Sequence, residues 1–504
     1  MAQRKAYRGK IRKEVLAFSG PALATVLADP LMSVVDALCV GRMCSTVQLG
    51  SLGPALAVFN FVNYFFFFLN AATAVLVTRS LACDDRSGAI DTIASAVFLA
   101  VVCGCLVTSL IAVLAPAMIA MTGCVAELIP AGTLYLRVRA LGQPVVLSAM
   151  VIQASLLAQL DVITPLQVVM LGCVLNVVGD LLWVPAVGAV GAAWATLLAQ
   201  VVSLPLMLWL ARRRGRLPVR LRVARLSELR TFFSTAAPLF MFEAGMSTCY
   251  ALIQSLSTQF TVAGAAAFQA LWSPLQVLAF MTYPLKQAAQ VFLPRMLALD
   301  PVSAEKQGTD GSSSGGSGSS SSSDGSSSDG GRSSDTATSA VGDDDTDADD
   351  GSLTVGGEPK SKLLLTVLAQ LSCTAGALLA ATGVWLAGNP SLFTSDTALW
   401  PVITSFTPYV WPPLLLLGFA QCLEGVLLGT GDLRFLSFSQ AGNVIVALGC
   451  LTLTKSLRMG VHGTWVVFGA FIASRAAQAS FRVFVQRRPW EQDVVCEVVG
   501  PVAD

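Results

Sequence analysis

Charged residues are scarce in this chain of 504 residues. Only 12% of them are Asp, Glu, Lys or Arg, whereas about 25% is usual in a soluble protein. This argues against a soluble enzyme of several domains. The 32 basic residues barely outnumber the 31 acidic ones, so there is no basic surplus to neutralise the phosphates of a nucleic acid. The sequence also lacks a GxxxxGK[ST] phosphate-binding loop, which argues against an ATP-driven motor.

Histidine is almost absent, because His462 is the only one, and this leaves little room for imidazole chemistry. The 12 cysteines form no CxxC pair, so we expect them to pack as small apolar side chains. We therefore expect no metal site, no bound cofactor and no enzymatic activity. Two alternatives from other functional classes are a membrane-embedded enzyme, which would need a cluster of His and Asp near one face, and a scaffold with an acidic recruitment loop.

Long uncharged apolar runs dominate the chain, of which 54% is hydrophobic. A helix needs about 20 apolar residues to cross a bilayer. The runs predict an all-α polytopic membrane protein with twelve transmembrane helices. We place these helices at 15–40, 48–78, 92–116, 133–158, 165–186, 189–211, 229–258, 262–298, 361–388, 399–428, 433–454 and 461–486.

The distribution of Lys and Arg predicts the orientation in the membrane. Twelve crossings place both termini on one side, and the segments that share that side carry most of the bases, including six between Arg4 and Lys13. Such segments normally face the inside. The predicted organisation is a basic N-terminal tail (1–13), an N-lobe of helices 1–6 (14–211), a basic inter-lobe loop (212–228), a C-lobe of helices 7–12 (229–488) and a C-terminal tail (489–504).

The C-lobe is interrupted by segment 300–358, which is rich in Ser, Gly and Asp and holds 13 acidic residues against two basic ones. This composition is typical of a disordered loop, and the topology puts it on the inner face. Because it offers no apolar face, we expect it to be dispensable for transport. We also expect it to contact the basic segment 212–230 weakly and in a salt-dependent way.

The two halves of the chain repeat a pattern of residues. Asp161 corresponds to Asp432 at a separation of 271 positions, and Gly188 corresponds to Gly460 at 272. These matches predict two pseudo-symmetric six-helix bundles. Because six is even, the bundles are parallel repeats with a substrate path between them.

Four polar residues of the first half form the main candidate site. They are Asp36, Asn176, Asp180 and Thr196. A carboxylate inside the membrane is costly and usually functional, and Asn176 and Asp180 share a helix face because they are four residues apart. Two carboxylates, an amide and a hydroxyl suit a proton or a small hard cation. The alternative is that these groups only bond the backbones of neighbouring helices.

Secondary candidates are Asp29, Glu243, Lys286 and Glu424. Asp29 shares a face with Asp36, and Glu243 could pair with Lys286 on the next helix as a purely structural contact. Lys286, Arg137 and Arg139 are bases within predicted spans, which favours an anionic solute. For the two arginines, a position at the membrane surface is the better interpretation. The rings of 64–68 cover every face of their helix, so some of them face lipid and others could line the cavity, and packing against lipid is the better interpretation for any one ring.

Several motifs resemble one transporter family. They are GPALATVLADPLMSVVDALCVGRM (20–43), LNVVGDLLWVPAVGAVGAAWATLLAQ (175–200), PLKQAAQVFLPRML (284–297) and LEGVLLGTGDLRF (423–435). They resemble the multidrug and toxic compound extrusion (MATE) transporters, and within these the DinF-like plastid branch of plants and algae. The resemblance implies two six-helix bundles in a V, efflux driven by H⁺ or Na⁺, and an N-lobe cation site at Asp36, Asn176, Asp180 and Thr196. The 300–358 insert and Lys286 depart from the family pattern.

We therefore expect a secondary active antiporter. It would export an organic solute, for which an amphipathic organic anion is favoured, in exchange for H⁺ or Na⁺ by alternating access between the lobes. A lipid-linked flippase of similar build is the alternative within membrane transport. The expected partners are the solute and the lipid bilayer, without nucleic acid, and the expected state is a monomer. The plastid envelope is implied by the resemblance alone.

Overall fold

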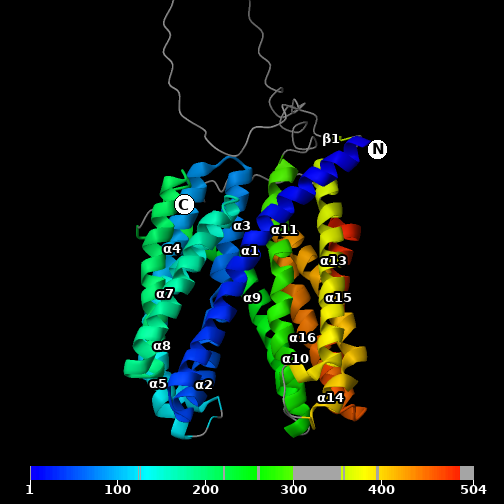
Figure 1. Cartoon of the computed structure of the whole chain (residues 1–504). Helices are drawn as coiled ribbons and strands as arrows, with labels where there is room; N and C mark the ends of the chain where they lie inside the picture. Colours follow the sequence, from blue (N-terminus) through cyan, green and yellow to red (C-terminus); the bar gives the residue numbers. More distant parts are fainter. Residues whose placement is uncertain are drawn as a thin grey trace, which may run out of the picture.

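The computed structural model describes residues 2–122, 124, 126–219, 222–257, 262–298, 354–355, 358–392 and 397–487. Nearly all of them are helical (Figure 1). The N-lobe consists of α1 (Ala2–Met43), α2 (Thr46–Phe65), α3 (Phe67–Ala82), α4 (Arg86–Ala120), η1 (Ala126–Leu128), α5 (Ile129–Ala140), α6 (Gln143–Ala158), α7 (Ile163–Val187) and α8 (Ala189–Arg213).

The C-lobe is also almost entirely helical. It consists of α9 (Leu226–Ser257), α10 (Val262–Ala279), η2 (Phe280–Thr282), α11 (Tyr283–Ala298), α13 (Lys360–Gly388), η3 (Pro390–Leu392), α14 (Trp400–Ser405), α15 (Thr407–Gly429), α16 (Leu433–Ser456), α17 (His462–Ser480) and the π-helical turn η4 (Phe481–Arg487). A two-stranded antiparallel pair, β1 (Thr354–Val355) and β2 (Glu358–Pro359), precedes α13.

Among the described residues, eight spans are long and apolar enough to cross a bilayer, and the α5–α6 pair, bent by 50°, makes up to a ninth. The twelve predicted crossings also include α1, the α10–α11 pair and α17, which are not among these spans. The fold class predicted from the sequence is thus confirmed: an all-α polytopic membrane protein of two six-helix bundles.

Four crossings that we predicted as single helices are broken in the structure. They are the second and fourth crossings of each lobe: α2–α3, α5–α6, α10–α11 and α14–α15. Pro144 and Pro408 stand in the first turn of α6 and of α15. Proline has no N–H to continue a preceding helix but is well accommodated in a first turn, so a new helix begins there.

The N-terminal residues differ from the prediction as well. Residues 2–13, predicted to form a tail, belong to α1, which continues without interruption to Met43. At the other end of the insert, residues 354–355 and 358–359 form the β1–β2 pair, in which Val355 pairs with Glu358. The rest of segment 300–358 lies outside the described residues, and so does its predicted contact with segment 212–230.

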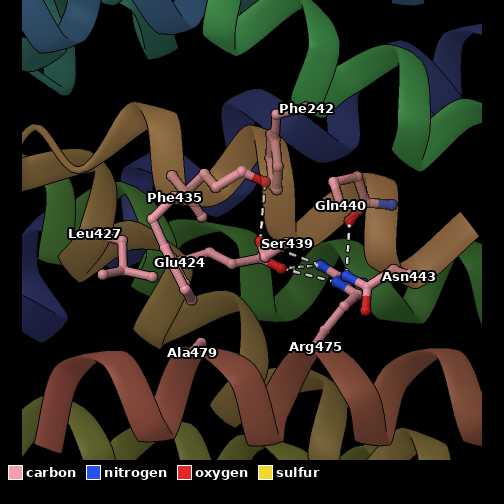
Figure 2. A pocket seen from close by; sticks show the side chains of 10 residues that line it. Phe242, Glu424, Leu427, Phe435, Ser439, Gln440, Asn443, Arg475 and Ala479 are labelled. Carbon is pink, nitrogen blue, oxygen red and sulfur yellow. Dashed lines mark hydrogen bonds and ion pairs between the residues drawn. The ribbon is translucent and has the colours of Figure 1, made fainter. Parts of the chain in front are cut away.

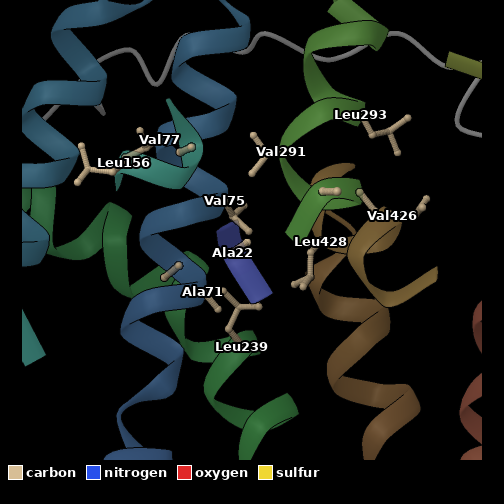
Figure 3. Packing of buried hydrophobic residues seen from close by; sticks show 14 of the residues in the cluster. Ala22, Ala71, Val75, Val77, Leu156, Leu239, Val291, Leu293, Val426 and Leu428 are labelled. Carbon is tan, nitrogen blue, oxygen red and sulfur yellow. The ribbon is translucent and has the colours of Figure 1, made fainter. Parts of the chain in front are cut away.

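The hydrophobic cores show how the two lobes meet. One core combines buried residues of α1, α3, α4 and α6 with those of α9, α11, α13 and α15, so both lobes share it (Figure 3). These residues lie in the halves of the helices toward the side predicted to be inner. The opposite halves have separate cores, one within the C-lobe and one within the N-lobe. The lobes therefore form a V whose apex is at the predicted inner face (Figure 1).

Helix α1 crosses from one lobe to the other. Its N-terminal part packs on α11 and α13 of the C-lobe, where the rings of Phe18 and Phe292 meet edge to face at 5.5 Å. Its C-terminal part packs on α7 of the N-lobe. Figure 1 shows this diagonal course. A displacement of α1 in the N-lobe would therefore also change its contacts with α11 and α13 of the C-lobe.

The aromatic run 64–68 also joins the lobes, so for three of its rings the contact with the other lobe replaces the favoured packing against lipid. Phe65 and Phe68 contact Phe240 of α9 at centroid distances of 5.0 and 5.6 Å, and Phe67 contacts Tyr283 of α11 at 6.1 Å. Edge-to-face aromatic pairs of this kind each contribute about 0.5–1.5 kcal/mol beyond their buried area. The run therefore helps to hold the two lobes together.

The predicted repeat is visible in matching side chains. Gly188 ends α7 and Gly460 precedes α17, and both have a positive φ, +71° and +61°, which glycine adopts without strain. Asp161 precedes α7 and pairs with Arg216, which follows the sixth crossing of its lobe. Asp432 precedes α16 and pairs with an arginine at the equivalent place in the other lobe, Arg482. The two lobes thus repeat a glycine turn and an ion pair.

Candidate functional site

Asp36 and Asn176 meet in the N-lobe, on α1 and α7. The side-chain amide of Asn176 donates a hydrogen bond of 2.6 Å to Oδ1 of Asp36. Both residues are buried. A hydrogen bond to an ionised carboxylate is about twice as strong as one between neutral groups. This contact therefore ties α1 to α7 most firmly when Asp36 is ionised.

Asp180 lies one turn beyond Asn176 and is fully buried. Its two carboxylate oxygens have no hydrogen-bond donor among the described residues, and neither does Oδ1 of Asn176. The charges of Asp36 and Asp180 act on each other, so the two carboxyl groups are near neighbours. Adjacent buried carboxylates without a donor between them require a proton or a cation to balance their charge.

Thr196 stands at the level of Asp180 on the neighbouring helix α8. Gly179 directly precedes Asp180, and Ala195 directly precedes Thr196. A Cβ added to Gly179 would lie 2.7 Å from the Cβ of Ala195, so α7 and α8 are in close contact at this level. The Thr196 hydroxyl donates to the carbonyl of Ala192 on its own helix. The structure thus brings Asp36, Asn176 and Asp180 together, with Thr196 beside them but bonded to its own backbone.

Two residues of α5 belong to this neighbourhood and were missed by our sequence analysis as members of it. Tyr135 is fully buried, and its hydroxyl has no partner in the described part of the chain. Arg139, one turn further along, lies 4.5 Å over the ring of Phe59, and its Nε and Nη1 are buried without a hydrogen bond to any described residue. Its charge acts on both Tyr135 and Asp180. The Tyr-x-x-x-Arg spacing within an apolar helix could have revealed the pair.

Arg137 lies elsewhere, on the exposed side of α5. Its Nε donates to the carbonyl of Ala112 at 3.0 Å. Because the two arginines are two positions apart, they point to different sides of the helix, and only Arg139 faces the interior. Arg137 is therefore exposed, whereas Arg139 is partly buried, and the predicted position of both at the membrane surface stays a prediction.

The C-lobe contains a second cluster, built on Glu424 of α15. Arg475 of α17 donates to both of its carboxylate oxygens, at 2.7 and 2.9 Å, and both residues are buried (Figure 2). Nζ of Lys286 on α11 lies 3.7 Å from Oε2 of Glu424. The printed ion pair of Lys286 is thus with Glu424, and Glu243, which we had considered as its structural partner, lies near enough to feel its charge. Arg475 is a further member of this cluster, which our sequence analysis did not name.

The remaining secondary candidates are Glu243 and Asp29. Glu243, on α9, lies near enough to Lys286, Glu424 and Arg475 for their charges to act on it. It therefore belongs to the edge of the C-lobe cluster. The side chain of Asp29 falls outside the described part of the chain.

On the inner face, the basic inter-lobe loop has acidic partners within the described residues. Arg222 pairs with Asp91 and Glu228 at 2.9 and 2.8 Å. Burial opposes ionisation of Asp161, but hydrogen bonds from Thr164 and the charge of Arg216 outweigh it and lower the pKa of Asp161. Asp161 is therefore ionised at neutral pH and holds the loop after α8. Glu358, at the end of the insert, pairs instead with Arg4 of α1.

Two parallel six-helix lobes, each with a buried cluster of ionisable side chains, define a multi-pass membrane protein with the architecture of a solute transporter.

Comparison with known proteins finds similar sequences. The MatE family profile matches residues 21–182. The chain is 27% identical to Protein DETOXIFICATION 47, chloroplastic, of Arabidopsis thaliana, over 91% of this chain and 75% of that protein. For Protein DETOXIFICATION 44, chloroplastic, of the same organism, the identity is 24% over 96% and 84%.

Solved structures show the same fold. A MATE transporter in the bent conformation matches with a TM-score of 0.72 at 16% identity, over 95% of each chain. An outward-facing MATE family multidrug resistance transporter of the MOP superfamily matches with 0.69 at 17%, over 95% and 96%. Together with the sequence matches, this shows that the chain resembles the MATE transporters, in the family profile over residues 21–182 and in fold over nearly its whole length. The family resemblance inferred from the motifs is confirmed.

Proposed function

We propose that this protein is a secondary active antiporter that exports an organic solute in exchange for H⁺. The observation that carries the proposal is the buried pair Asp36–Asp180, because neither oxygen of Asp180 has a hydrogen-bond donor among the described residues. Two adjacent buried carboxylates repel each other unless a proton or a cation balances their charge. Na⁺ is the alternative coupling ion, since carboxylate, amide and hydroxyl oxygens also suit a hard cation.

Protonation of the carboxylate pair weakens its hydrogen bonding to neighbouring side chains. When Asp36 is ionised, it attracts the amide of Asn176 and holds α1 against α7. When the pair gains a proton, that attraction weakens and α1 is freer to shift relative to α7 and α8. Because α1 packs on both lobes, the shift alters the contact between them. Coupling then requires that the solute bind one of the two arrangements better than the other.

The charges of the interior favour an organic anion as the solute. Arg139 presents unpaired nitrogens beside the N-lobe pair, and Lys286 and Arg475 lie in the C-lobe. The solute would bind between the lobes, and the protein would act as a monomer. Both curated relatives are described as chloroplastic, which supports the plastid envelope as the location of this protein.

Reconstitution tests this function. The purified chain would be placed in proteoliposomes with fluorescent organic anions and cations of matched size, under an imposed pH gradient or an imposed Na⁺ gradient. The proposal expects movement of anions against their own gradient when pH differs across the membrane, and collapse of this movement with a protonophore. Flux that does not change with either the pH gradient or the Na⁺ gradient would contradict antiport. Solute movement driven by the Na⁺ gradient alone would contradict H⁺ as the coupling ion.

A further inference from the structure

Residues 2–13 of α1 form a basic helix on the flank of the C-lobe. They precede the predicted first crossing at 15–40 and hold six Lys and Arg residues but no acidic residue. Figure 1 shows this part of α1 slanting across the C-lobe, where the helix packs on α11 and α13. Positive charges so close together repel one another, so negatively charged neighbours stabilise them.

One side of this basic helix faces the protein and finds a counter-charge there. Ile11 is buried, with 2% of its surface exposed. Arg4 and Arg8, one turn apart, both lie near the carboxylate of Glu358, at 3.1 and 3.8 Å. Because Glu358 carries a single negative charge, it balances only one of the bases of the helix.

The opposite side carries bases together with an apolar side chain. Lys5 and Arg12 are seven residues apart and Leu16 follows four residues later, so the three share a face, with Lys13 at its edge. All four side chains are exposed, and Leu16 has 49% of its surface accessible. The three bases form no ion pair with any described residue. The nearby acid, Glu14, is two positions after Arg12 and therefore points to another side of the helix.

The packing of α1 sets the direction of this face. Helix α13 is one of the spans that are long and apolar enough to cross the bilayer. A helix that packs on the side of a crossing helix turns its opposite face away from the protein in the plane of the membrane. Bases next to an exposed leucine are typical of the depth at which headgroups meet acyl chains. The face of Lys5, Arg12, Lys13 and Leu16 is therefore directed toward the surrounding lipid.

Two sources of negative charge could meet this face, and Leu16 distinguishes them. The acidic insert joins the protein beside α1, because Glu358 pairs with Arg4. The insert is rich in Ser, Gly and Asp, so it could balance the bases but would leave the leucine in water. A phospholipid supplies both a negative headgroup and an acyl chain, and covering an exposed leucine with apolar groups is favourable.

We propose that the face formed by Lys5, Arg12, Lys13 and Leu16 is a binding site for an anionic phospholipid, with the headgroup on the bases and an acyl chain against the leucine. Each base near an anionic membrane surface raises the affinity about fivefold. The bound lipid would hold the N-terminal part of α1 on the C-lobe, at the end of the helix opposite to Asp36.

Native mass spectrometry of the full chain in detergent tests the site without any ion gradient, so the result does not depend on antiport. The probes are phosphatidylglycerol and phosphatidylcholine with the same acyl chains, which differ in net charge. The site predicts at least about tenfold tighter binding of phosphatidylglycerol, and a smaller preference at higher ionic strength, because salt screens exposed charges. Equal affinity for the two lipids would overturn the proposal.

Variants assign the binding to this face. Arg12→Gln/Lys13→Gln should weaken phosphatidylglycerol about tenfold, whereas Arg86→Gln/Arg434→Gln, which removes two exposed bases at the same end of the two lobes, should leave it unchanged. Leu16→Ser should weaken both lipids about threefold, because it removes the contact with the acyl chain. All of these side chains are exposed, so the variants are expected to fold. An equal loss in the control pair would overturn the site.

Deletion of residues 302–352 separates the lipid from the acidic insert. If lipid occupies the face, the affinity for phosphatidylglycerol stays within about twofold of that of the full chain. A rise of about tenfold or more after the deletion, abolished by Arg12→Gln/Lys13→Gln, would show that the insert is the occupant and would overturn the proposal. Unchanged binding of phosphatidylglycerol in Arg12→Gln/Lys13→Gln itself would place the lipid elsewhere and overturn it as well.

Discussion

Asn176 donates a 2.6 Å hydrogen bond to Asp36, and this bond joins α7 to α1 inside the N-lobe. Asp36 belongs to the helix that packs on both lobes, whereas Asn176 belongs to a helix of one lobe. A change in the charge of Asp36 therefore acts at a point where the position of α1 is set. Because α1 packs on both lobes, its position in turn affects how the lobes contact each other.

Asn176→Ala is expected to weaken coupling without abolishing it. The substitution removes the donor to Asp36 and costs about 1–3 kcal/mol for an unsatisfied buried group, but it leaves both titrating carboxyls in place. Flux driven by a pH gradient should fall about tenfold in proteoliposomes. Asn389→Ala, which removes an exposed amide, serves as the matched control. A complete loss in Asn176→Ala would assign to the amide a role as essential as that of the acids.

Phe240→Ala should favour opening of the inner face. Phe240 contacts Phe65 and Phe68 across the lobe interface, and its removal deletes both ring pairs. The loss of about 1–2 kcal/mol corresponds to a change of roughly tenfold in the ratio of the two arrangements. Spin labels at positions 86 and 434, on the inner ends of the two lobes, would report it as a longer distance in double electron–electron resonance.

The control for this experiment is Phe233→Ala, because Phe233 is an exposed ring on the same helix. Its distance distribution should match that of the unsubstituted protein. An unchanged distribution in Phe240→Ala would show that the aromatic contacts do not hold the inner face closed.

Asp161→Asn should destabilise the protein in a pH-dependent way. The pKa of Asp161 is lowered in the folded state, so its ionised form stabilises the fold above the ordinary pKa of aspartic acid, and this contribution is lost as the pH falls through the lowered folded value. At neutral pH we expect a loss of about 2 kcal/mol, because the amide keeps one oxygen acceptor but lacks the negative charge that strengthens the hydrogen bonds from Thr164 and Arg216.

Thermal unfolding of the purified protein from pH 7 downward would measure this effect. The difference in melting temperature between Asp161→Asn and the unsubstituted protein should shrink as the pH falls and vanish when Asp161 is protonated in both states. A difference that stays constant over the whole range would assign the effect to packing rather than to charge.

Deletion of residues 302–352 should leave transport intact. The segment is acidic and low in apolar residues, and closing a shorter or longer surface loop changes the folding free energy only slightly. The deletion retains Glu358, which pairs with Arg4. Folded protein of normal yield with no flux would show that this segment takes part in transport.

The sequence predicted the architecture well, since the charge spacing and the repeat of Asp161 with Asp432 define two six-helix halves. It did not locate the break between α10 and α11, because an apolar run has the same pattern whether it is one helix or two. The break between α5 and α6 lies next to Pro144, and this proline could have indicated it.

The candidate N-lobe site was accessible from the sequence because intramembrane carboxylates are costly and the spacing of Asn176 and Asp180 places them on one face. The sequence did not identify the ion-pair partner of Lys286. Glu243 and Glu424 are both acids in apolar helices, and only the packing of α9, α11 and α15 decides that Glu424 is the closer one. Likewise, Arg139 and Arg137 look equivalent in sequence, and the contact with Phe59 separates them.

The measurement that bears most directly on the coupling site is pH-gradient-driven flux in Asp180→Asn. Asparagine has nearly the same shape as aspartate but cannot take up or release a proton, so the variant should insert and fold normally while losing gradient-driven flux. Asp36→Asn should behave in the same way. Normal flux in folded Asp180→Asn under a pH gradient would contradict the assignment of the carboxylate pair as the site of coupling.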